Sequence, residues 1–311
     1  MQPEVNRMME NSKRKEMKSL LAKIRKGRPL ISDGAWGTLL QARGLQPGEC
    51  PELWNITHRS DVFAIAKSYI DAGADIILTN SFGGNPLKLS HFGLSGRAEE
   101  LNDAAAQISR EAAGIDKFVL GSMGPSGAIL MMGEVSEQEL FDGFALQAAA
   151  LKKGGVDAIC IETMSAIDEA SIAVRAAKES TGLEIVCTFT FEKTISGEYR
   201  SMMGVSPTDM VQSIKKAGAS VIGTNCGNGF EQMIGIVKEI RRIDTVTPIL
   251  VHANAGKPII RDGMTKYPDT PEMMATTMHE LIAEGANIVG GCCGTTPAHI
   301  RALVLSIKNE K

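Results

Sequence analysis

A short sequence phrase that recurs down the chain constrains its fold more than any other feature. A glycine, a small apolar residue and a polar residue come directly before an apolar, β-branched run. Glycine ends a helix in the left-handed conformation, and the apolar run that follows is typical of a strand buried on both faces. The phrase therefore marks repeated helix-to-strand junctions, which lie at Gly73, Gly155, Gly218 and Gly285.

The intervals between these junctions complete an alternating pattern. Apolar runs predict strands near residues 29–33, 75–80, 117–122, 156–162, 184–191, 219–225, 248–253 and 286–291. Helices are predicted near residues 60–73, 97–114, 136–154, 165–181, 207–218, 229–243, 270–285 and 297–309, several of them with capping residues at their starts. Strand and helix alternating eight times predict an α/β fold of the (β/α)8 TIM-barrel type.

The first 28 residues predict an extra element before the barrel. They hold the chain's one dense run of Lys and Arg, with apolar residues at helical spacing, namely Met17, Leu20, Leu21 and Ile24. This pattern is typical of a solvated amphipathic helix packed on the domain. Contact with a membrane or a nucleic acid is the alternative, which the interspersed glutamates disfavour. We therefore expect an N-terminal amphipathic helix over residues 1–28 and one barrel domain over residues 29–311.

Composition limits the classes of partner. The net charge is −3 with acids and bases interspersed, so no nucleic-acid partner is expected. No run approaches the ~18 apolar residues of a spanning helix, and the N-terminus has no apolar segment of signal-peptide type. Six cysteines without such a segment indicate a reducing, cytoplasmic setting, where metal binding or catalysis is commoner than disulfides.

Three of these cysteines are placed for chemistry. Cys226 follows the sixth predicted strand, and Cys292 and Cys293 follow the eighth, each within a glycine-rich segment. The carboxyl ends of barrel strands form one mouth, where catalytic groups of this fold lie. Three thiolates at that mouth predict a zinc site, and three protein ligands with a fourth position open are typical of catalytic zinc.

Other interpretations of this region remain open. Free cysteine is often a small buried apolar residue, which is the interpretation we give to Cys160 and Cys187. His252, on the strand between the two cysteine-bearing strands, is a possible metal ligand, although a barrel-core role is commoner. The glycine-rich loop after the last strand also resembles the phosphate sites that barrels often build there, but its cysteines disfavour that function.

With these features in place, the motifs resemble those of the homocysteine S-methyltransferases, a family of zinc-dependent barrels. The resemblance covers about residues 29–305 and is closest to the homocysteine module of cobalamin-dependent methionine synthase. It depends on the segments Asp33–Thr38, Thr79–Asn85, Gly121–Gly127, Ile161–Thr163, Gly223–Cys226, Asn254–Pro258 and Gly290–Pro297.

The resemblance implies a role for each matching residue. Cys226, Cys292 and Cys293 are implied to bind Zn²⁺, with the homocysteine sulfur in the fourth position. Asp33 and Glu162 are implied to hold the ammonium group of the amino acid, and the backbone amides of Gly34 and Ala35 its carboxylate. Asn254 is implied to lie beside the metal and to occupy its open position when substrate is absent. We also expect Asn225 to contact substrate, with hydrogen bonding of a strand end as its alternative role.

The expected reaction is methylation of homocysteine to methionine. We expect the methyl donor to be a methylcorrinoid, such as methylcobalamin, on a separate protein or module, because the chain carries no recognisable donor module. Direct transfer from betaine or S-methylmethionine, or methylation of another thiol or selenol, is the alternative. Thr163 stands where the betaine-dependent branch carries an aromatic residue, which disfavours betaine. A zinc-buffering or thiol-sensing barrel is the non-enzymatic alternative.

Overall fold

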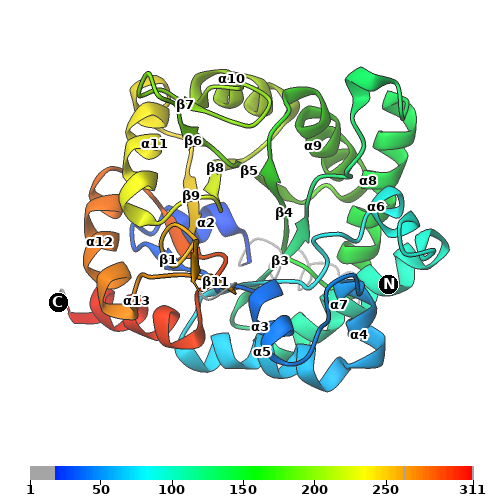
Figure 1. Cartoon of the computed structure of the whole chain (residues 1–311), viewed down its shortest axis with the longest axis horizontal. Coiled ribbons are helices and arrows are strands. Elements are labelled where there is room, and N and C mark those ends of the chain that lie inside the picture. Colours follow the sequence, from blue (N-terminus) through cyan, green and yellow to red (C-terminus); the bar gives the residue numbers. More distant parts are fainter. Residues whose placement is uncertain (1–17, 262–263, 310–311) are drawn as a thin grey trace, which may run out of the picture.

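The computed structural model describes residues 18–261 and 264–309, and eight parallel strands form its centre (Figure 1). Their order around the ring is β1, β12, β9, β8, β5, β4, β3 and β2. The strands are β1 (Leu30–Ile31), β2 (Ile76–Leu78), β3 (Phe118–Met123), β4 (Ala158–Met164), β5 (Glu184–Phe189), β8 (Val221–Asn225), β9 (Ile249–Ala253) and β12 (Ile288–Gly291). The predicted TIM-barrel class is confirmed, and each predicted strand overlaps an observed one.

The ring closes between β1 and β2 through individual hydrogen bonds rather than a strand ladder. The Asp75 amide donates to the Ile31 carbonyl at 2.7 Å, and the Ile31 amide donates to the Asp75 carboxylate at 3.2 Å. Nearer the carboxyl ends of the same two strands, the Leu78 amide donates to the Asp33 carboxylate at 2.8 Å. Two aspartates thus complete the hydrogen bonding of this seam.

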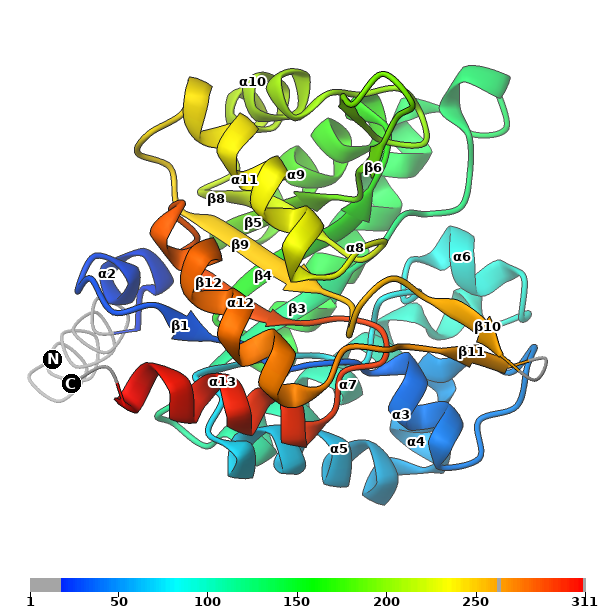
Figure 2. The ribbon, with the colours of Figure 1, turned by 60° about the vertical axis from the view of Figure 1, so that its left-hand side comes forward.

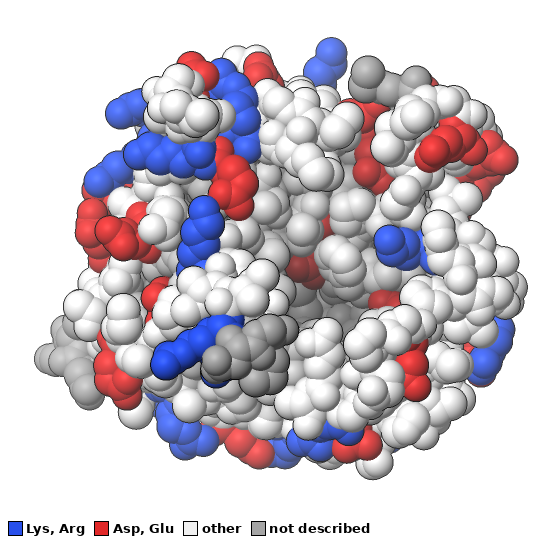
Figure 3. Space-filling view, viewed as in Figure 1, with Lys and Arg blue, Asp and Glu red and all other residues white. Residues whose placement is uncertain are grey.

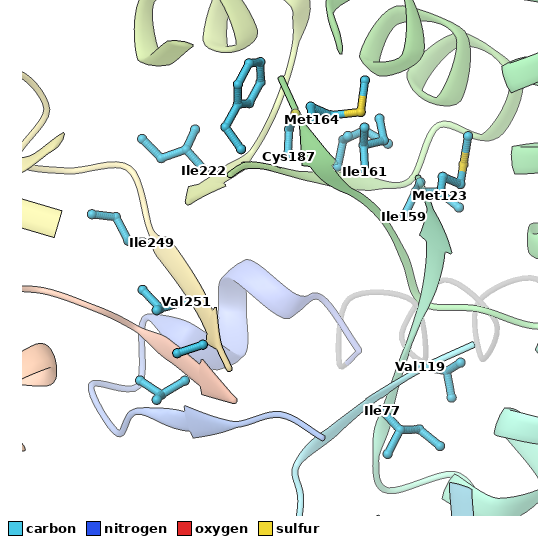
Figure 4. Close-up of a cluster of buried hydrophobic side chains, with 14 of the residues drawn as sticks. Ile77, Val119, Met123, Ile159, Ile161, Met164, Cys187, Ile222, Ile249 and Val251 are labelled. Carbon is cyan, nitrogen blue, oxygen red and sulfur yellow. The ribbon is translucent and has the colours of Figure 1, made fainter. Parts of the chain in front are cut away.

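Helices cover the outside of the ring (Figure 1). They are α5 (Arg59–Ala72), α7 (Ala98–Ala113), α8 (Glu137–Gly154), α9 (Ile167–Thr181), α10 (Pro207–Ala217), α11 (Phe230–Ile243), α12 (Pro271–Ala283) and α13 (Pro297–Asn309). Alternate strand residues such as Ile77, Ile159 and Ile222 point outwards and form the main core with these helices (Figure 4). This alternation explains why the strands read as continuous apolar runs.

A second, smaller core fills the inside of the barrel. It holds the inward-facing residues of the strands, including Cys160, Val186 and Leu250. Leu20 and Ile24 of the short helix α2 (Leu20–Ile24) belong to this cluster and are almost completely buried. Figure 2 shows α2 at the end of the barrel away from the hairpin of β10 (Ile259–Arg261) and β11 (Met264–Lys266), so α2 closes the amino-terminal end.

The loops after the strands contain elements that the sequence did not predict. They are α3 (Gly37–Ala42), η1 (Pro51–Leu53), α4 (Trp54–Thr57), α6 (Pro86–Ser90), η2 (Ser95–Arg97), η3 (Leu130–Met132), the hairpin β6 (Glu192–Lys193) with β7 (Tyr199–Arg200), and the hairpin β10 (Ile259–Arg261) with β11 (Met264–Lys266). All belong to connections that leave the carboxyl ends of strands, so they shape the mouth of the barrel.

Most of the predicted N-terminal helix, residues 1–17, lies outside the described residues. The division into a helix over residues 1–28 and a barrel over residues 29–311 therefore remains a prediction. Among the described residues, none of the helices combines the length and apolar character needed to cross a membrane.

Candidate metal and substrate site

A cavity of about 380 Å³ opens at the carboxyl ends of the strands. Figure 3 shows it as a hollow in the centre of this face, with acidic side chains inside and a largely uncharged rim. Cys226, Cys292 and Cys293 line one part of the cavity, and Asp33 and Glu162 line another. Residues separated by up to 260 positions in the sequence thus share one chamber.

The three cysteine sulfurs lie within 4.8 Å of one another. Strand β9 holds both cysteine segments, because the Cys226 amide donates to the His252 carbonyl at 2.9 Å and the Cys292 amide to the Ala253 carbonyl at 2.6 Å. Cys226 adopts a left-handed backbone conformation, with φ of 60°. This grouping is the one that the spacing of the cysteines at the ends of the sixth and eighth strands predicted.

The thiols form a hydrogen-bonded cluster with uneven proton affinity. The Cys226 and Cys292 thiols donate to the Cys293 sulfur, which lowers the pKa of Cys293 well below its usual value. The pKa of Cys292 is raised well above its usual value, because this thiol donates to Cys226 and Cys293 and is buried. One thiolate is therefore favoured without a metal, and a bound dication would favour all three.

Two unpaired polar atoms near the cysteines bear on whether a cation fits here. The Asn254 Oδ1 and His252 Nε2 atoms are buried and have no hydrogen-bond partner within the described part of the chain. The amide of the next residue, Ala255, donates to the Cys293 carbonyl at 3.0 Å, so Asn254 adjoins the cysteine segment. Buried polar atoms without partners are rare in native proteins and often mark an ion or ligand site. Three soft thiols beside such atoms fit a zinc ion.

His252 lines the cavity but has no charge to offer at neutral pH. Burial lowers the pKa of His252 to about 4, so the imidazole is neutral. It lies on the inner face of β9 against Gly290, where a Cβ atom would approach its Cδ2 to 2.9 Å. Among the described residues it is not part of the three-residue group that could hold a metal ion.

Asp33 lies at the end of β1 and is almost completely buried. Its carboxylate accepts hydrogen bonds from the Leu78 amide, the Trp36 indole at 2.9 Å and the Ser32 hydroxyl at 3.1 Å. Burial nevertheless raises the pKa of Asp33 to about 6. Asp33 therefore both closes the barrel seam and presents a carboxyl to the cavity.

Glu162 lies on β4 and accepts a hydrogen bond from the Ser122 hydroxyl. Burial raises the pKa of Glu162 to about 7, and the charges of Asp33 and Cys293 contribute to this increase. A buried carboxyl with one hydrogen-bond donor gains most from a cationic partner. The two carboxyls are thus suited to an ammonium group.

The backbone at Gly34 and Ala35 lines the same cavity, but one of its amides is already used. The Ala35 amide donates to the Thr295 hydroxyl at 3.0 Å. A Cβ atom on Gly34 would approach the Thr295 Oγ1 to 2.6 Å, so only glycine fits there. Receipt of a carboxylate by these amides therefore remains a prediction, better supported for Gly34 than for Ala35.

Asn225 and Asn254 are not among the described residues that line this cavity. Asn225 is fully buried, and its side-chain amide bonds Thr163 and Thr188 instead. The geometry thus favours the alternative role of hydrogen bonding strand ends over the predicted substrate contact. Asn254 precedes Ala255, whose amide bonds the Cys293 carbonyl, and its implied place beside the metal remains a prediction.

Sequence reasoning did not identify Glu52 as a cavity residue. It lies on η1, is 3% exposed, and accepts hydrogen bonds from the Gly83 amide at 2.7 Å and the Cys50 thiol at 3.3 Å. Burial raises its pKa. No periodic pattern marks this loop, so only the burial of a carboxylate, visible in the structure, reveals it.

A larger cavity of about 670 Å³ adjoins the first. Among the described residues, Thr163 lines both cavities. Its other walls come from the loops after β3, β4 and β5 and include Met202 and Met203, which are exposed.

Comparison with known proteins gives one family match. The family described as homocysteine S-methyltransferase matches residues 30–307. The methionine synthase of Mycobacterium tuberculosis is 32% identical over 304 residues, which cover 91% of this chain and 25% of that protein. The methionine synthase of Mycobacterium leprae is 30% identical over 300 residues, which cover 90% and 24%. The chain thus spans about a quarter of the length of these curated relatives.

Among solved structures, the metallated form of the homocysteine methyltransferase MmuM from Escherichia coli is similar, with a TM-score of 0.74. The match covers 91% of this chain and 97% of that one, at 23% identity. The oxidised form of the same protein gives a TM-score of 0.73. At this level of identity the likeness supports the barrel fold alone.

Proposed function

This chain belongs to the homocysteine S-methyltransferase family, and we propose that it methylates homocysteine, held as a thiolate on a zinc ion, to give methionine. One observation carries the proposal: the three sulfurs, within 4.8 Å of one another, share a cavity with the buried carboxyls of Asp33 and Glu162. One cavity thus offers sulfur ligands for a metal ion, which would bind the substrate thiol, and two carboxyls, which would bind the substrate ammonium group.

Cys226, Cys292 and Cys293 would hold the zinc ion. When bound, the ion would lower the pKa of the incoming thiol and keep its sulfur at one point as a nucleophilic thiolate. Three cysteine thiolates rather than histidines make this site electron-rich. The Asn254 carbonyl oxygen, buried without a partner, is suited to lie at the open position before substrate binds.

Asp33 and Glu162 would bind the ammonium group, and the cavity would exclude water from the sulfur. The two carboxyls have raised pKa values, so an ammonium beside them favours their charged forms and would release protons. The backbone near Gly34 would receive the substrate carboxylate. These contacts fix the amino acid at one end, so that its sulfur reaches the metal site with little freedom.

We propose that the methyl donor is a methylcorrinoid on a separate protein or module, because the relatives named methionine synthase are about four times as long as the matched region. Both cavities, at about 380 Å³ and about 670 Å³, are too small to enclose a corrinoid, which would therefore have to approach the site from the open mouth. Exposed apolar residues at the mouth, including Met202 and Ile260, suit transient contact with another protein surface.

A cationic small-molecule donor is the second candidate, and one observation favours it. The described lining of the larger cavity holds three acidic residues, Asp168, Glu169 and Glu192, and one basic residue, Arg200. The described lining of that cavity contains no aromatic side chain, which disfavours a quaternary ammonium such as betaine. A sulfonium donor such as S-methylmethionine is the form of this alternative that fits better.

All six cysteines of the described structure are free thiols. Free thiols at a metal site need a reducing compartment, so we propose a cytoplasmic location.

The function is tested with zinc-loaded protein and three donors side by side. Methylcobalamin, betaine and S-methylmethionine are each supplied with homocysteine, and methionine is measured. We expect methionine from methylcobalamin and none above background from betaine. Fast turnover with S-methylmethionine would instead support the second candidate, and no product from any donor would contradict a transferase function.

A further inference from the structure

Two residues other than glycine have a left-handed backbone in the described structure, and both lie at the site. Thr163 has φ of 62° and Cys226 has φ of 60°. A β-branched residue is rarely found in this region, and such a conformation costs about 1–3 kcal/mol unless its surroundings impose it. Something must therefore hold Thr163 in place.

The side chain of Asn225 makes the contacts that impose this conformation. Its Oδ1 accepts the Thr163 backbone amide at 2.8 Å, and its Nδ2 donates to the Thr163 hydroxyl at 2.7 Å. The Thr188 hydroxyl donates to the same Oδ1 at 2.6 Å. One buried amide thus joins the ends of β4, β5 and β8.

The neighbours of these residues give the contacts a consequence for the site. Asn225 directly precedes the metal-side Cys226, and Thr163 directly follows the substrate-side Glu162. A shift of the Thr163 turn would therefore move the Glu162 carboxyl, and a shift of Asn225 would move the Cys226 sulfur. Thr163 also lines both cavities, so a shift of the turn would change the wall of each.

We propose that Asn225 is a positioning residue: by holding Thr163 in a left-handed turn, its amide fixes the Glu162 carboxyl and the Cys226 sulfur relative to each other. The inference rests on the proposed function, since it assigns these two groups to the two ends of homocysteine. Direct contact with substrate is the competing role. It is disfavoured because Asn225 is 0% exposed and its amide already bonds both threonines.

The test is a double-mutant cycle of Asn225→Ser and Thr163→Gly in the zinc-loaded protein. We call the hydrogen bonds from the Asn225 side chain to Thr163 the clamp. Glycine adopts the left-handed conformation without strain, so with Thr163→Gly the turn no longer needs the clamp to hold it. We expect Asn225→Ser to weaken homocysteine binding about 10-fold in the wild-type background and less than about 3-fold in the Thr163→Gly background. Calorimetry gives the homocysteine dissociation constant, and metal analysis confirms that zinc is retained.

Asn228→Ser is the matched control. Asn228 is also a buried asparagine beside Cys226, but its amide donates to the Phe191 carbonyl at 2.8 Å and does not bond Thr163. Its effect on homocysteine binding should be the same in both backgrounds. Thr188→Val is a milder second variant should Asn225→Ser fail to fold, with a smaller loss that Thr163→Gly also relieves.

Two outcomes would overturn the proposal. An Asn225→Ser loss of equal size in both backgrounds would mean that Asn225 acts independently of the turn, as a substrate contact would. No loss in either background would mean that the clamp positions nothing.

A second measurement, made without homocysteine, tests the clamp independently of the proposed function. Cobalt in place of zinc gives sulfur-to-metal charge-transfer absorption without any homocysteine. We expect Asn225→Ser to change this spectrum and Thr163→Gly to restore it. Absence of homocysteine binding by the wild-type protein would contradict the proposed function, while the cobalt spectra would still decide the clamp.

Discussion

The two parts of the cavity differ in how far the fold completes them: we call the part lined by the three cysteines the sulfur side, and the part lined by Asp33 and Glu162 the carboxylate side. The three cysteines are partly buried, lie in glycine-rich segments after β8 and β12, and have unpaired polar atoms beside them. Asp33 and Glu162 are buried, extend barrel strands, and accept hydrogen bonds from fixed neighbours. The sulfur side therefore needs a cation to be complete, whereas the carboxylate side is folded in advance, and its raised pKa values mean that an ammonium partner would favour the charged carboxylates. Binding affinity for metal and for amino acid should accordingly be separable.

The largest expected effect is on the sulfur side. Cys226→Ser should weaken zinc binding at least about 100-fold, because one of three soft ligands is lost and the other two cannot hold the ion alone. Methyl transfer should fall to background with it. Competition with a zinc chelator measures the affinity. Cys187→Ala, at a buried cysteine on β5 outside the cavity, is the control and should retain zinc.

The next largest effect is on the carboxylate side and should leave zinc in place. Glu162→Gln should weaken homocysteine binding about 10- to 100-fold, since the ammonium loses a charged partner in a buried site. Calorimetry with homocysteine, after zinc content is verified, measures this. Loss of zinc together with homocysteine in this variant would break the separation of the two sides.

The same substitution should stabilise the fold at neutral pH. Burial raises the pKa of Glu162 from 4.5 to about 7, so the folded chain binds more protons than the unfolded chain in this window. The stabilisation is complete below about pH 4.5 and is lost as pH rises through 7. Glu162→Gln removes this loss and should raise the free energy of unfolding by about 1–3 kcal/mol at pH 8. Denaturant unfolding at pH 5 and pH 8 checks the sign, and an equal effect at both pH values would contradict it.

A moderate effect is expected on the pH dependence of binding. The pKa values of Asp33 and Glu162 are about 6 and about 7, so both carboxyls are largely protonated at pH 5. Homocysteine affinity at saturating zinc should therefore rise with pH between 5 and 7, and the steepest part should weaken in Glu162→Gln. Calorimetry in buffers of different ionisation enthalpy also counts the protons released. Affinity that falls with rising pH would contradict the assigned carboxyl roles.

The smallest effect on binding is expected at the far end of the barrel. Leu20→Ala removes a buried side chain of α2 and should lower the free energy of unfolding by about 2–4 kcal/mol. Because α2 closes the end away from the cavity, zinc and homocysteine affinities should stay within about 2-fold of wild type. Thermal unfolding and calorimetry on one sample test both halves of this prediction.

The sequence predicted the barrel well because each junction carries a local signal. The glycines at 73, 155 and 218 do adopt left-handed caps, and the capping box at Ser136 is present. The hairpins β6–β7 and β10–β11 were missed, since two or three paired residues have no periodic signature.

The site was predictable in part. Cysteines at the ends of the sixth and eighth strands had to meet once the barrel was inferred, and they do. Asn225 shows the limit: a polar residue at a strand end gives the same signal whether it contacts substrate or holds a turn. Glu52 gave no signal, because its burial results from the fold of a loop rather than from its position in a strand.

Zinc-edge X-ray absorption of the loaded protein, before and after homocysteine, tests the central claim most directly. We predict three sulfur neighbours at about 2.3 Å and one lighter atom before substrate, and four sulfur neighbours afterwards. A shell dominated by nitrogen and oxygen, or a sulfur count that homocysteine leaves unchanged, would contradict the account.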